Sequence, residues 1–445
     1  MFRTSAHSVI DVADGRSTYA CGRPGSNVLS WVLAVGFIVS AIAFACVGIY
    51  RFAAPLGFAG GEYTTMVDLQ DKVAWNRQGI TYAGPIFVLE SLFVVGPGLA
   101  PASLMVPVNF VLFAAAFLCV WLALGRGFGI RALLVVLGLW LVHQATIIDL
   151  GTNEHLEILE LAGIAGTLLL LTRYRDRGAG ALLGIATMVK ILPGIFIPYF
   201  VLIRKWTFAL SATVSAGLLL LVVCWIQRIT PWRAVYEMLY QSSVWTYSDT
   251  SIGYRSPYMQ GVRPAMSRML VRLDPALSAG GHNELVIVGA SVISVAAAVT
   301  VIWTLMRTRS TRSERSYGLE FGLICSAMLL ITPQGHMSYY VLVLPAFTAA
   351  FLSLIKRQKD RWTGWLWVGF AASYGLSAFR GATFAKFVPQ PLAAIQRVSG
   401  IDMGSIFNNW ELLDMATVAM ILLLALITVL LLNDGMPKTN ESLRS

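Results

Sequence analysis

Three carboxylates give one part of the chain the residue types needed for acid–base chemistry. Glu62, Asp68 and Asp71 follow the first strongly apolar run, and an apolar stretch with two prolines, residues 84–100, comes directly after them. Asp68 and Asp71 are three residues apart and could share one helix face, so one carboxylate could tune the other. This pattern favours a catalytic loop above an interfacial helix. A solvated loop that leads into an ordinary helix is the alternative.

The composition places these carboxylates in a membrane protein. Of the 445 residues, 57% are hydrophobic and 13% are charged, whereas soluble domains average about 25% charged residues. Several apolar runs reach the ~20 residues that a helix needs to cross a bilayer, and the alternation typical of membrane barrels is missing. The formal net charge of +10 comes from basic residues between these runs, which indicates cytoplasmic loops and no nucleic-acid partner. We therefore expect an all-α, polytopic transmembrane helix bundle.

The apolar runs also predict the domain organisation. Residues 1–27 and 434–445 are expected to be cytoplasmic tails, and residues 28–433 a single transmembrane domain with external loops at 51–103, 228–283 and 380–414. The predicted spans are Val28–Tyr50, Leu104–Leu124, Ala132–Leu150, Leu156–Leu171, Thr207–Ile226, Leu285–Met306, Gly318–Ile331, Tyr339–Ile355, Gly364–Ser377 and Met415–Leu432.

Short basic turns set the predicted orientation, because such turns stay in the cytoplasm. These turns contain Arg126 and Arg131, Arg173–Arg177, Arg204–Lys205, Arg307–Arg315 and Lys356–Arg361. They share one side only if residues 178–203 form a hairpin that turns near Lys190–Pro193. Each arm would extend ~18 Å, which is less than the ~30 Å bilayer core, so protein must shield it or the membrane must thin. With this hairpin, and with residues 84–100 not crossing, we expect about 12 crossings.

This topology collects the hydrophilic groups on the external face. The three carboxylates, the polar corner at residues 149–155, Lys190, His336 and the two later loops all fall there. A carrier would more often place its ionisable groups near the midplane, between inverted repeats. The shared face therefore favours an enzyme in the inner (plasma) membrane, with its active site facing outward.

The order of these features resembles that of the GT-C glycosyltransferases. The similar branch is the one that uses polyprenyl-phosphate-mannose and includes the phosphatidylinositol-mannoside mannosyltransferases. Its external loop has an Asp-Leu motif followed by a Tyr-Pro-Pro-like apolar helix, to which Asp68-Leu69 and Tyr82-Ala83-Gly84-Pro85 are similar, with one proline in place of two.

Three later motifs extend this resemblance to roughly residues 30–210 and 318–355. A Gly-x-x-Asn corner resembles the segment that ends at Asn153, and a Gly-rich run ending in Lys-x-x-Pro resembles the one with Lys190 and Pro193. The Ser-Pro…His-His-Tyr element of the family is similar to Thr332–Tyr340, where His336 is single.

The resemblance implies inverting transfer of a sugar, most simply mannose, from a polyprenyl-phosphate donor to a lipid or glycan acceptor, with no cofactor. Asp68 would be the general base that takes the proton of the acceptor hydroxyl, with Glu62 and Asp71 in reserve. Lys190 would face the donor phosphate, where negative charge develops as the glycosidic bond breaks. A lone lysine within an apolar hairpin costs ~2.5–3.5 kcal/mol near the bilayer centre, which favours function over simple snorkelling to the interface.

Other residues are candidates for substrate binding or for structural roles. The substrate-binding candidates besides Lys190 are Glu62, Asp71, Tyr82, Asn153, His155, Arg255, Arg263 and His336. Asn153 and His155 could instead cap the helix that begins near Leu156. His143 and Glu160 lie within spans, where we expect the bundle to satisfy them.

Nothing in the sequence requires a metal ion, since no DxD-type cluster or His/Asp spacing is present and the five cysteines show no ligand spacing. Three other functions remain possible on the same residues. One is another enzyme, either an arabinofuranosyl or other pentosyl transferase or an oligosaccharide ligase. Another is a lipid or oligosaccharide transporter whose pathway is lined by Lys190, Glu90, His143 and Glu160. The third is a non-catalytic subunit that positions a lipid for a partner.

Overall fold

The computed structural model describes residues 101–152, 157–227, 230–235, 261–273, 284–309, 316–332, 335, 337–357, 361–378 and 415–434, with four isolated positions between 35 and 42. Within these ranges the chain forms helices and no strand, which confirms the predicted all-α class there. The carboxylate loop, the apolar stretch 84–100, the loop 380–414 and both tails lie outside the described residues. The crossing of residues 84–100 therefore stays a prediction.

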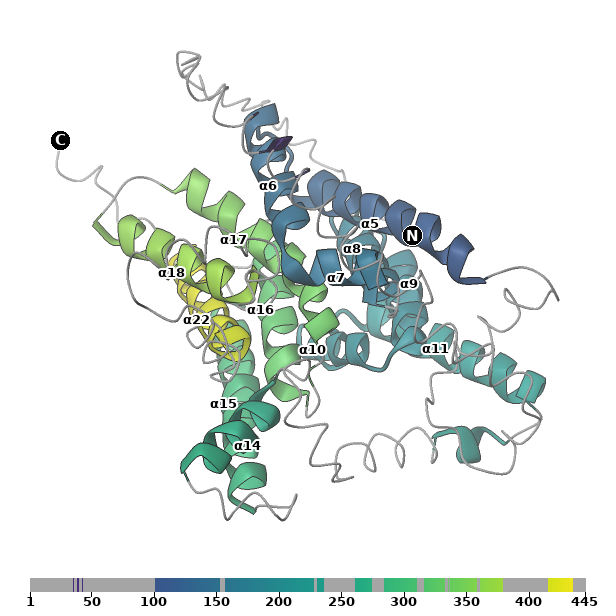
Figure 1. Ribbon diagram of the computed structural model, residues 1–445. Helices are drawn as coiled ribbons and strands as arrows, with labels where there is room; N and C mark the ends of the chain where they lie inside the picture. The colour runs from purple at the N-terminus through teal and green to yellow at the C-terminus, as the bar shows by residue number, and fades with distance from the viewer. Residues whose placement is uncertain are drawn as a thin grey trace, which may run out of the picture.

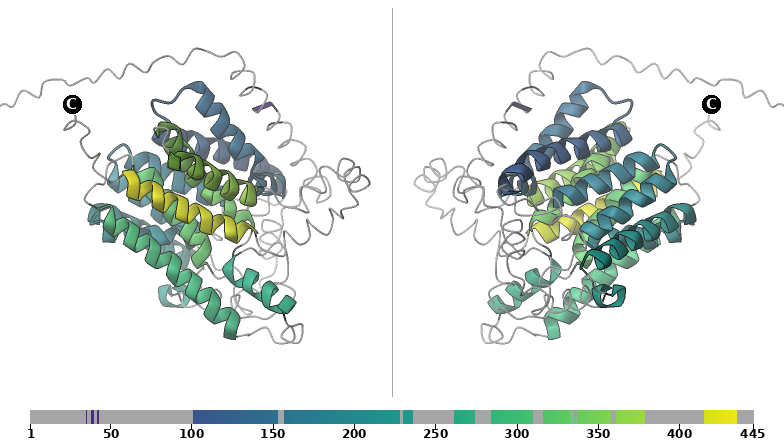
Figure 2. Two further views of the ribbon diagram at one scale, coloured as in Figure 1. Left: turned by 90° about the vertical axis from the view of Figure 1, so that its left-hand side faces the viewer. Right: turned by 90° about the vertical axis from the view of Figure 1, so that its right-hand side faces the viewer.

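The helices form two groups joined by short elements (Figure 1). The first group packs in the order α5 (Pro101–Leu124), α8 (Glu157–Leu171), α9 (Asp176–Val189) and α11 (Trp206–Gln227). The second group contains α15 (Glu284–Arg307), α16 (Ser316–Ile331), α17 (Leu344–Lys356), α18 (Arg361–Ala378) and α22 (Met415–Asp434), with α14 (Val262–Leu273) against α15. The connecting elements are α6 (Ile130–Val142), α7 (Gln144–Thr152), η1 (Leu192–Ile195), α10 (Phe196–Leu202) and η3 (Met337–Val343). Figure 2 shows the long helices running side by side.

Apolar side chains point outward from the peripheral helices and inward from the central ones. Leu210, Leu218 and Trp225 of α11 are exposed, as are Val292 and Val299 of α15, whereas nearly every side chain of α16 is buried. Five described helices are long and apolar enough to cross a membrane, or up to six if the bent pair α6–α7 is one span. This is a multi-pass arrangement, and the total of about 12 crossings remains a prediction.

The predicted hairpin at residues 178–203 is present, and two hydrogen bonds show how it runs. The Ser211 hydroxyl donates to the carbonyl of Arg177 (2.7 Å), and the Ser215 hydroxyl donates to the carbonyl of Ala181 (3.0 Å). Both pairs are 34 residues apart, so α9 and α11 are parallel. Two parallel helices in sequence require the segment between them, η1 and α10, to return to the starting end.

An ion pair closes this return path. The Lys205 ammonium, just before α11, lies 2.7 Å from Oδ1 of Asp176, the first residue of α9, and 5.3 Å from the ring centre of Tyr317. Burial lowers the pKa of Lys205, but the hydrogen bond from Lys205 to Asp176 and the interactions with Tyr317 outweigh it, so the pKa is raised above its ordinary value. Lys205 is therefore a cation throughout the physiological range.

Close packing of α9 on α11 depends on glycine. A Cβ atom built on Gly184 would lie 2.3 Å from the carbonyl oxygen of Ala212 and 2.1 Å from the Ser215 hydroxyl. A backbone carbonyl in a helix cannot move aside as a flexible side chain can, so only glycine permits this distance.

The basic turns share one end of the bundle, as predicted. Lys205 joins the turns before α9 and α11 to the start of α16, and Gly318 of α16 packs against Leu124 at the end of α5. Lys356 lies 4.4 Å from the ring centre of Phe128, which joins the turn after α17 to that after α5. The described basic residues of this end, called the basic end below, are Arg126, Arg131, Arg173, Arg175, Arg177, Arg204, Lys205, Arg307, Arg309, Lys356 and Arg357. That the basic end is cytoplasmic stays a prediction.

Candidate functional site

Three interrupted helices meet at the end of the bundle opposite the basic end. The first is α6–α7, the second is α9–η1, and the third is η3, which continues into α17. η3 packs against α7, α8, α16 and α17. In a bilayer, interrupted backbone is tolerated where protein buries it or where it lines an aqueous cavity, and broken helices often carry the binding site of a membrane protein.

The first interruption lies within the predicted span 132–150. α6 and α7 are bent by 64° at His143, without proline. Nδ1 of His143 accepts the backbone N–H of Ala145 (3.3 Å), as an N-cap side chain does. Nε2 therefore carries the proton and donates to the Ser377 hydroxyl (3.4 Å). The amide of Gln144 donates to the carbonyl of Ser377 (2.8 Å), so both residues anchor the bend to α18. His143 is satisfied within the bundle, as expected.

Proline accounts for the second interruption. Pro193 has no N–H to give to the carbonyl of Val189, and its ring would clash with that carbonyl, so α9 ends at Val189. Lys190 follows with φ −142° and ψ 147°, an extended backbone. The side chain of Lys190 is thereby placed at the end of α9, away from the basic end.

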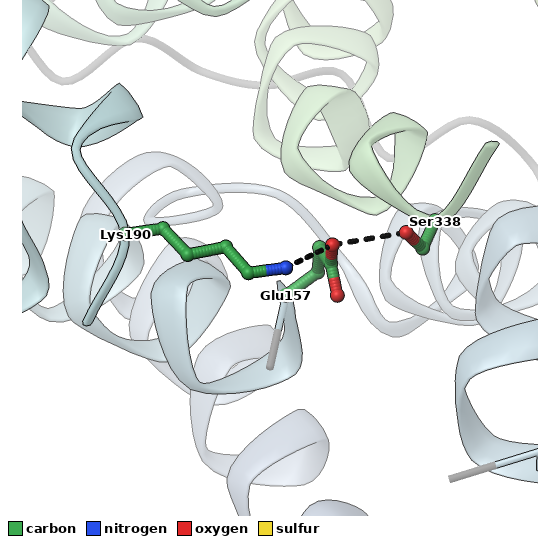
Figure 3. A network of polar contacts seen from close by, with 3 residues as sticks. All are labelled: Glu157, Lys190 and Ser338. Atoms are coloured by element: carbon green, nitrogen blue, oxygen red, sulfur yellow. Dashed lines mark hydrogen bonds and ion pairs between the residues drawn. The ribbon is translucent and has the colours of Figure 1, made fainter. Parts of the chain in front are cut away.

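The side chain of Lys190 is held by a buried carboxylate (Figure 3). Nζ of Lys190 donates to Oε1 of Glu157 at 2.7 Å, and the Ser338 hydroxyl donates to the same oxygen at 2.9 Å. The side chain of Lys190 is 16% exposed and that of Glu157 is 1% exposed. The ammonium also lies 5.0 Å from the ring centre of Tyr339, within cation–π distance. These four residues, Glu157, Lys190, Ser338 and Tyr339, are called the Glu157 cluster below.

The helix ends stabilise the charges of this pair. Glu157 is the first residue of α8, where the partial positive charge of the helix N-terminus favours a carboxylate. Lys190 follows the last residue of α9, where the partial negative charge of the C-terminus favours a cation. Because α8 and α9 are antiparallel neighbours, the two ends lie side by side. Each helix contributes about 0.3–1 kcal/mol to its charged residue, and more where the geometry is buried.

Of the predicted site residues, the structure describes two. Lys190 lies in the Glu157 cluster, and its pairing with Glu157 corrects the expectation of a lone lysine. Arg263 lies in α14 and is buried. Asp68, Glu62, Asp71, Tyr82, Asn153, His155, Arg255 and His336 lie outside the described residues.

The structure brings together two segments that the resemblance singled out. The Lys-x-x-Pro segment meets the Thr332–Tyr340 segment through the contacts of Lys190 with Tyr339 and of Ser338 with Glu157. The start of α14 joins the same region, because Gly261 packs against the backbone of Gly335. Gly261 has a φ of +145°, a conformation that favours glycine. Arg263 follows two residues later.

Sequence reasoning missed Glu157 and Ser338. Two further buried acids, Asp149 of α7 and Glu160 of α8, lie on the helices on either side of the polar corner. In the described ranges, His, Cys, Asp and Glu residues form no group of three that could hold a metal ion.

The outward-facing apolar helices and the polar cluster at one end define a multi-pass membrane protein with a candidate site opposite its basic turns. Residues 82–333 match the model of glycosyltransferase family 87, which is more than half of the chain. The protein belongs to this family and is a membrane glycosyltransferase. The match includes Glu157 and Lys190, ends before Ser338 and begins after Asp68. Searches of curated proteins and of solved structures give no match.

Proposed function

We propose that the protein transfers mannose, with inversion, from a polyprenyl-phosphate donor to a lipid or glycan acceptor on the extracytoplasmic face. The observation that carries this proposal is the position of Lys190. Its side chain is partly exposed, at the end of the bundle opposite the basic end, where three interrupted helices meet. The basic end is taken as cytoplasmic because short basic turns are retained there.

Lys190 supplies the positive charge that the leaving phosphate requires. When the bond between the sugar and the phosphate breaks, its electron pair stays on the phosphate oxygen, and a fixed cation stabilises that charge. The ammonium of Lys190 is pre-oriented by Glu157 and by the ring of Tyr339, so little reorganisation accompanies the reaction. Lys190 also contacts the phosphate before reaction, so it contributes to donor binding as well as to rate.

Asp68 supplies the base in this proposal. The acceptor oxygen attacks the anomeric carbon from the side opposite the phosphate while Asp68 takes its proton. A carboxylate at the membrane boundary is partly desolvated, which raises its pKa toward the range useful for a base. Glu62 and Asp71 are the reserve candidates. Arg255, Arg263 and His336 are proposed contacts of the phosphate or headgroup, and Tyr82, Asn153 and His155 of the sugar or acceptor.

Purified protein in lipid nanodiscs, given radiolabelled polyprenyl-phosphate-mannose and a membrane lipid extract as acceptor, tests this function. Wild-type protein should form labelled product. Asp68→Asn should lower kcat by at least about 100-fold, the usual contribution of a general base, with donor binding unchanged. Lys190→Ala should raise KM and lower kcat, because it removes a contact made in both the ground state and the transition state.

The control is Lys205→Ala, which removes the lysine that follows the hairpin at the basic end. Its folded fraction should transfer at the wild-type rate. Full activity of Asp68→Asn would transfer the role of base to Glu62 or Asp71. Transfer of arabinofuranose but not mannose from the corresponding donors would refute the proposed sugar, and donor movement across the bilayer without transfer would refute the proposed reaction.

A further inference from the structure

Glu157 places a negative charge beside the cation that the donor phosphate would use. Its carboxylate accepts a hydrogen bond from the Lys190 ammonium at 2.7 Å. The Glu157 side chain is 1% exposed, so little water is present to screen its charge. A phosphate bound to Lys190 would therefore lie within a few ångströms of a second anion. Charges at this separation in a poorly solvated site interact far more strongly than in water.

The phosphate groups of the donor and of the product carry different charges, and both would lie near Glu157. A polyprenyl-phosphate-sugar is a phosphodiester with one negative charge. The polyprenyl phosphate released by transfer is a monoester, and monoesters carry about −1.5 to −2 at pH 7. Repulsion by a fixed carboxylate is therefore greater for the product than for the donor.

We propose that Glu157 is a specificity-determining residue that acts through Lys190, weakening the binding of the polyprenyl monophosphate product relative to the phosphodiester donor. This inference rests on the proposed function of the site. Lys190 alone would bind the more highly charged product more tightly and would remain blocked after each transfer. Because Glu157 offsets part of the positive charge of Lys190, the product is held less tightly and dissociates.

The hydrogen bond from Ser338 adjusts the strength of this effect. The Ser338 hydroxyl donates to Oε1 of Glu157, the same oxygen that accepts the hydrogen bond from Lys190. It therefore draws negative charge away from the ion pair. Loss of this hydrogen bond leaves Oε1 more negative. The carboxylate then holds Lys190 more firmly and repels the product more strongly.

The two variants therefore act in opposite directions. Glu157→Gln keeps an oxygen that can accept from Lys190 and Ser338 but removes the charge. It should tighten inhibition by polyprenyl monophosphate at least about tenfold and lower the donor KM by less, so that the ratio of Ki for product to KM for donor falls. Ser338→Ala should raise the same ratio a few-fold. General damage to the site would weaken both ligands and leave the ratio unchanged.

Glu320→Gln is the matched control. Glu320 is also a fully buried carboxylate, but it accepts hydrogen bonds from Tyr199 and Ser316 near the basic end. The test measures initial rates in nanodiscs with radiolabelled polyprenyl-phosphate-mannose and added polyprenyl monophosphate, for wild type and all three variants. Glu320→Gln should keep the wild-type ratio.

The outcomes separate the two proposals. If wild-type protein neither transfers the sugar nor is inhibited by polyprenyl monophosphate, the proposed function fails. If wild type transfers the sugar but Glu157→Gln changes the ratio no more than Glu320→Gln does, the function stands and the role of Glu157 is refuted. Should Glu157→Gln not fold, Ser338→Ala decides alone, because an unchanged or lower ratio overturns the proposal.

Discussion

Two ion pairs of equal length should differ several-fold in their contribution to stability. Lys190–Glu157 and Lys205–Asp176 both have N–O distances of 2.7 Å, but the exposed fractions of their side chains are 16% and 1% in the first and 22% and 32% in the second. Removing one partner of a buried pair leaves an uncompensated buried charge and costs about 3–5 kcal/mol. Lys205–Asp176 is half-buried and water reaches both of its side chains, so we expect it to approach the roughly 0.2–1 kcal/mol of exposed pairs, whose charges water screens.

We therefore expect Lys190→Met to lower the free energy of unfolding by about 3–5 kcal/mol and Lys205→Met by at most about 1 kcal/mol. Methionine keeps most of the side-chain volume, so the loss of charge dominates each change. The double variant Lys190→Met/Glu157→Gln should be more stable than Lys190→Met alone, because the stranded carboxylate is gone. Glutamine still accepts the hydrogen bond from Ser338.

The assay is reversible unfolding in mixed micelles, with the free energy extrapolated to zero denaturant. A double-mutant cycle over Lys190 and Glu157 gives their coupling energy, which should reach about 1–3 kcal/mol. Equal costs for the two lysine variants would refute the reasoning, because burial would then not control the strength of the pair. A double variant less stable than Lys190→Met would refute it as well.

Two further predictions concern the hairpin. Single cysteines at Arg177 and Arg204, in a cysteine-free background, should both react with a membrane-impermeant maleimide only from the cytoplasmic side, and reaction from opposite sides would contradict the hairpin. Gly184→Ala should destabilise the protein by about 1–3 kcal/mol in the same unfolding assay, because its Cβ would meet the carbonyl of Ala212. Gly217→Ala on α11, whose Cβ would meet no atom within 4 Å, should be neutral or stabilising, and equal losses for the two glycine variants would show that packing of α9 on α11 is not the cause.

Patterns along the sequence predict features that depend on local chemistry. Apolar runs predict the long helices because each must bury or expose a continuous apolar surface, and α11 and α15 begin and end within one residue of the expected spans. The basic turns predict the hairpin, because no other path places them on one side. The bend at His143 escapes such reasoning, since Ser377, which anchors it, is 234 residues away.

The pairing of Glu157 with Lys190 could have been predicted from the sequence. Glu157 lies 16 residues before Arg173, and Lys190 lies 16 residues after Tyr174. Two antiparallel helices joined by a turn between Arg173 and Tyr174 would therefore place them opposite each other. The first of these helices begins at an acid, and the second is ended by a proline next to a base. Ser338 could not be found in this way, because its contact with Glu157 depends on how η3 packs against α8.

The shortness of α9 has a consequence for the acceptor. Its 14 residues extend about 21 Å, so with the basic end at one boundary of a ~30 Å hydrocarbon layer, Lys190 lies about 9 Å below the opposite boundary. In the proposed mechanism, the reacting hydroxyl must descend by that distance, beneath the lipid headgroups. A lipid-borne sugar or the end of a slender glycan can reach such a depth, but the surface of a folded protein cannot.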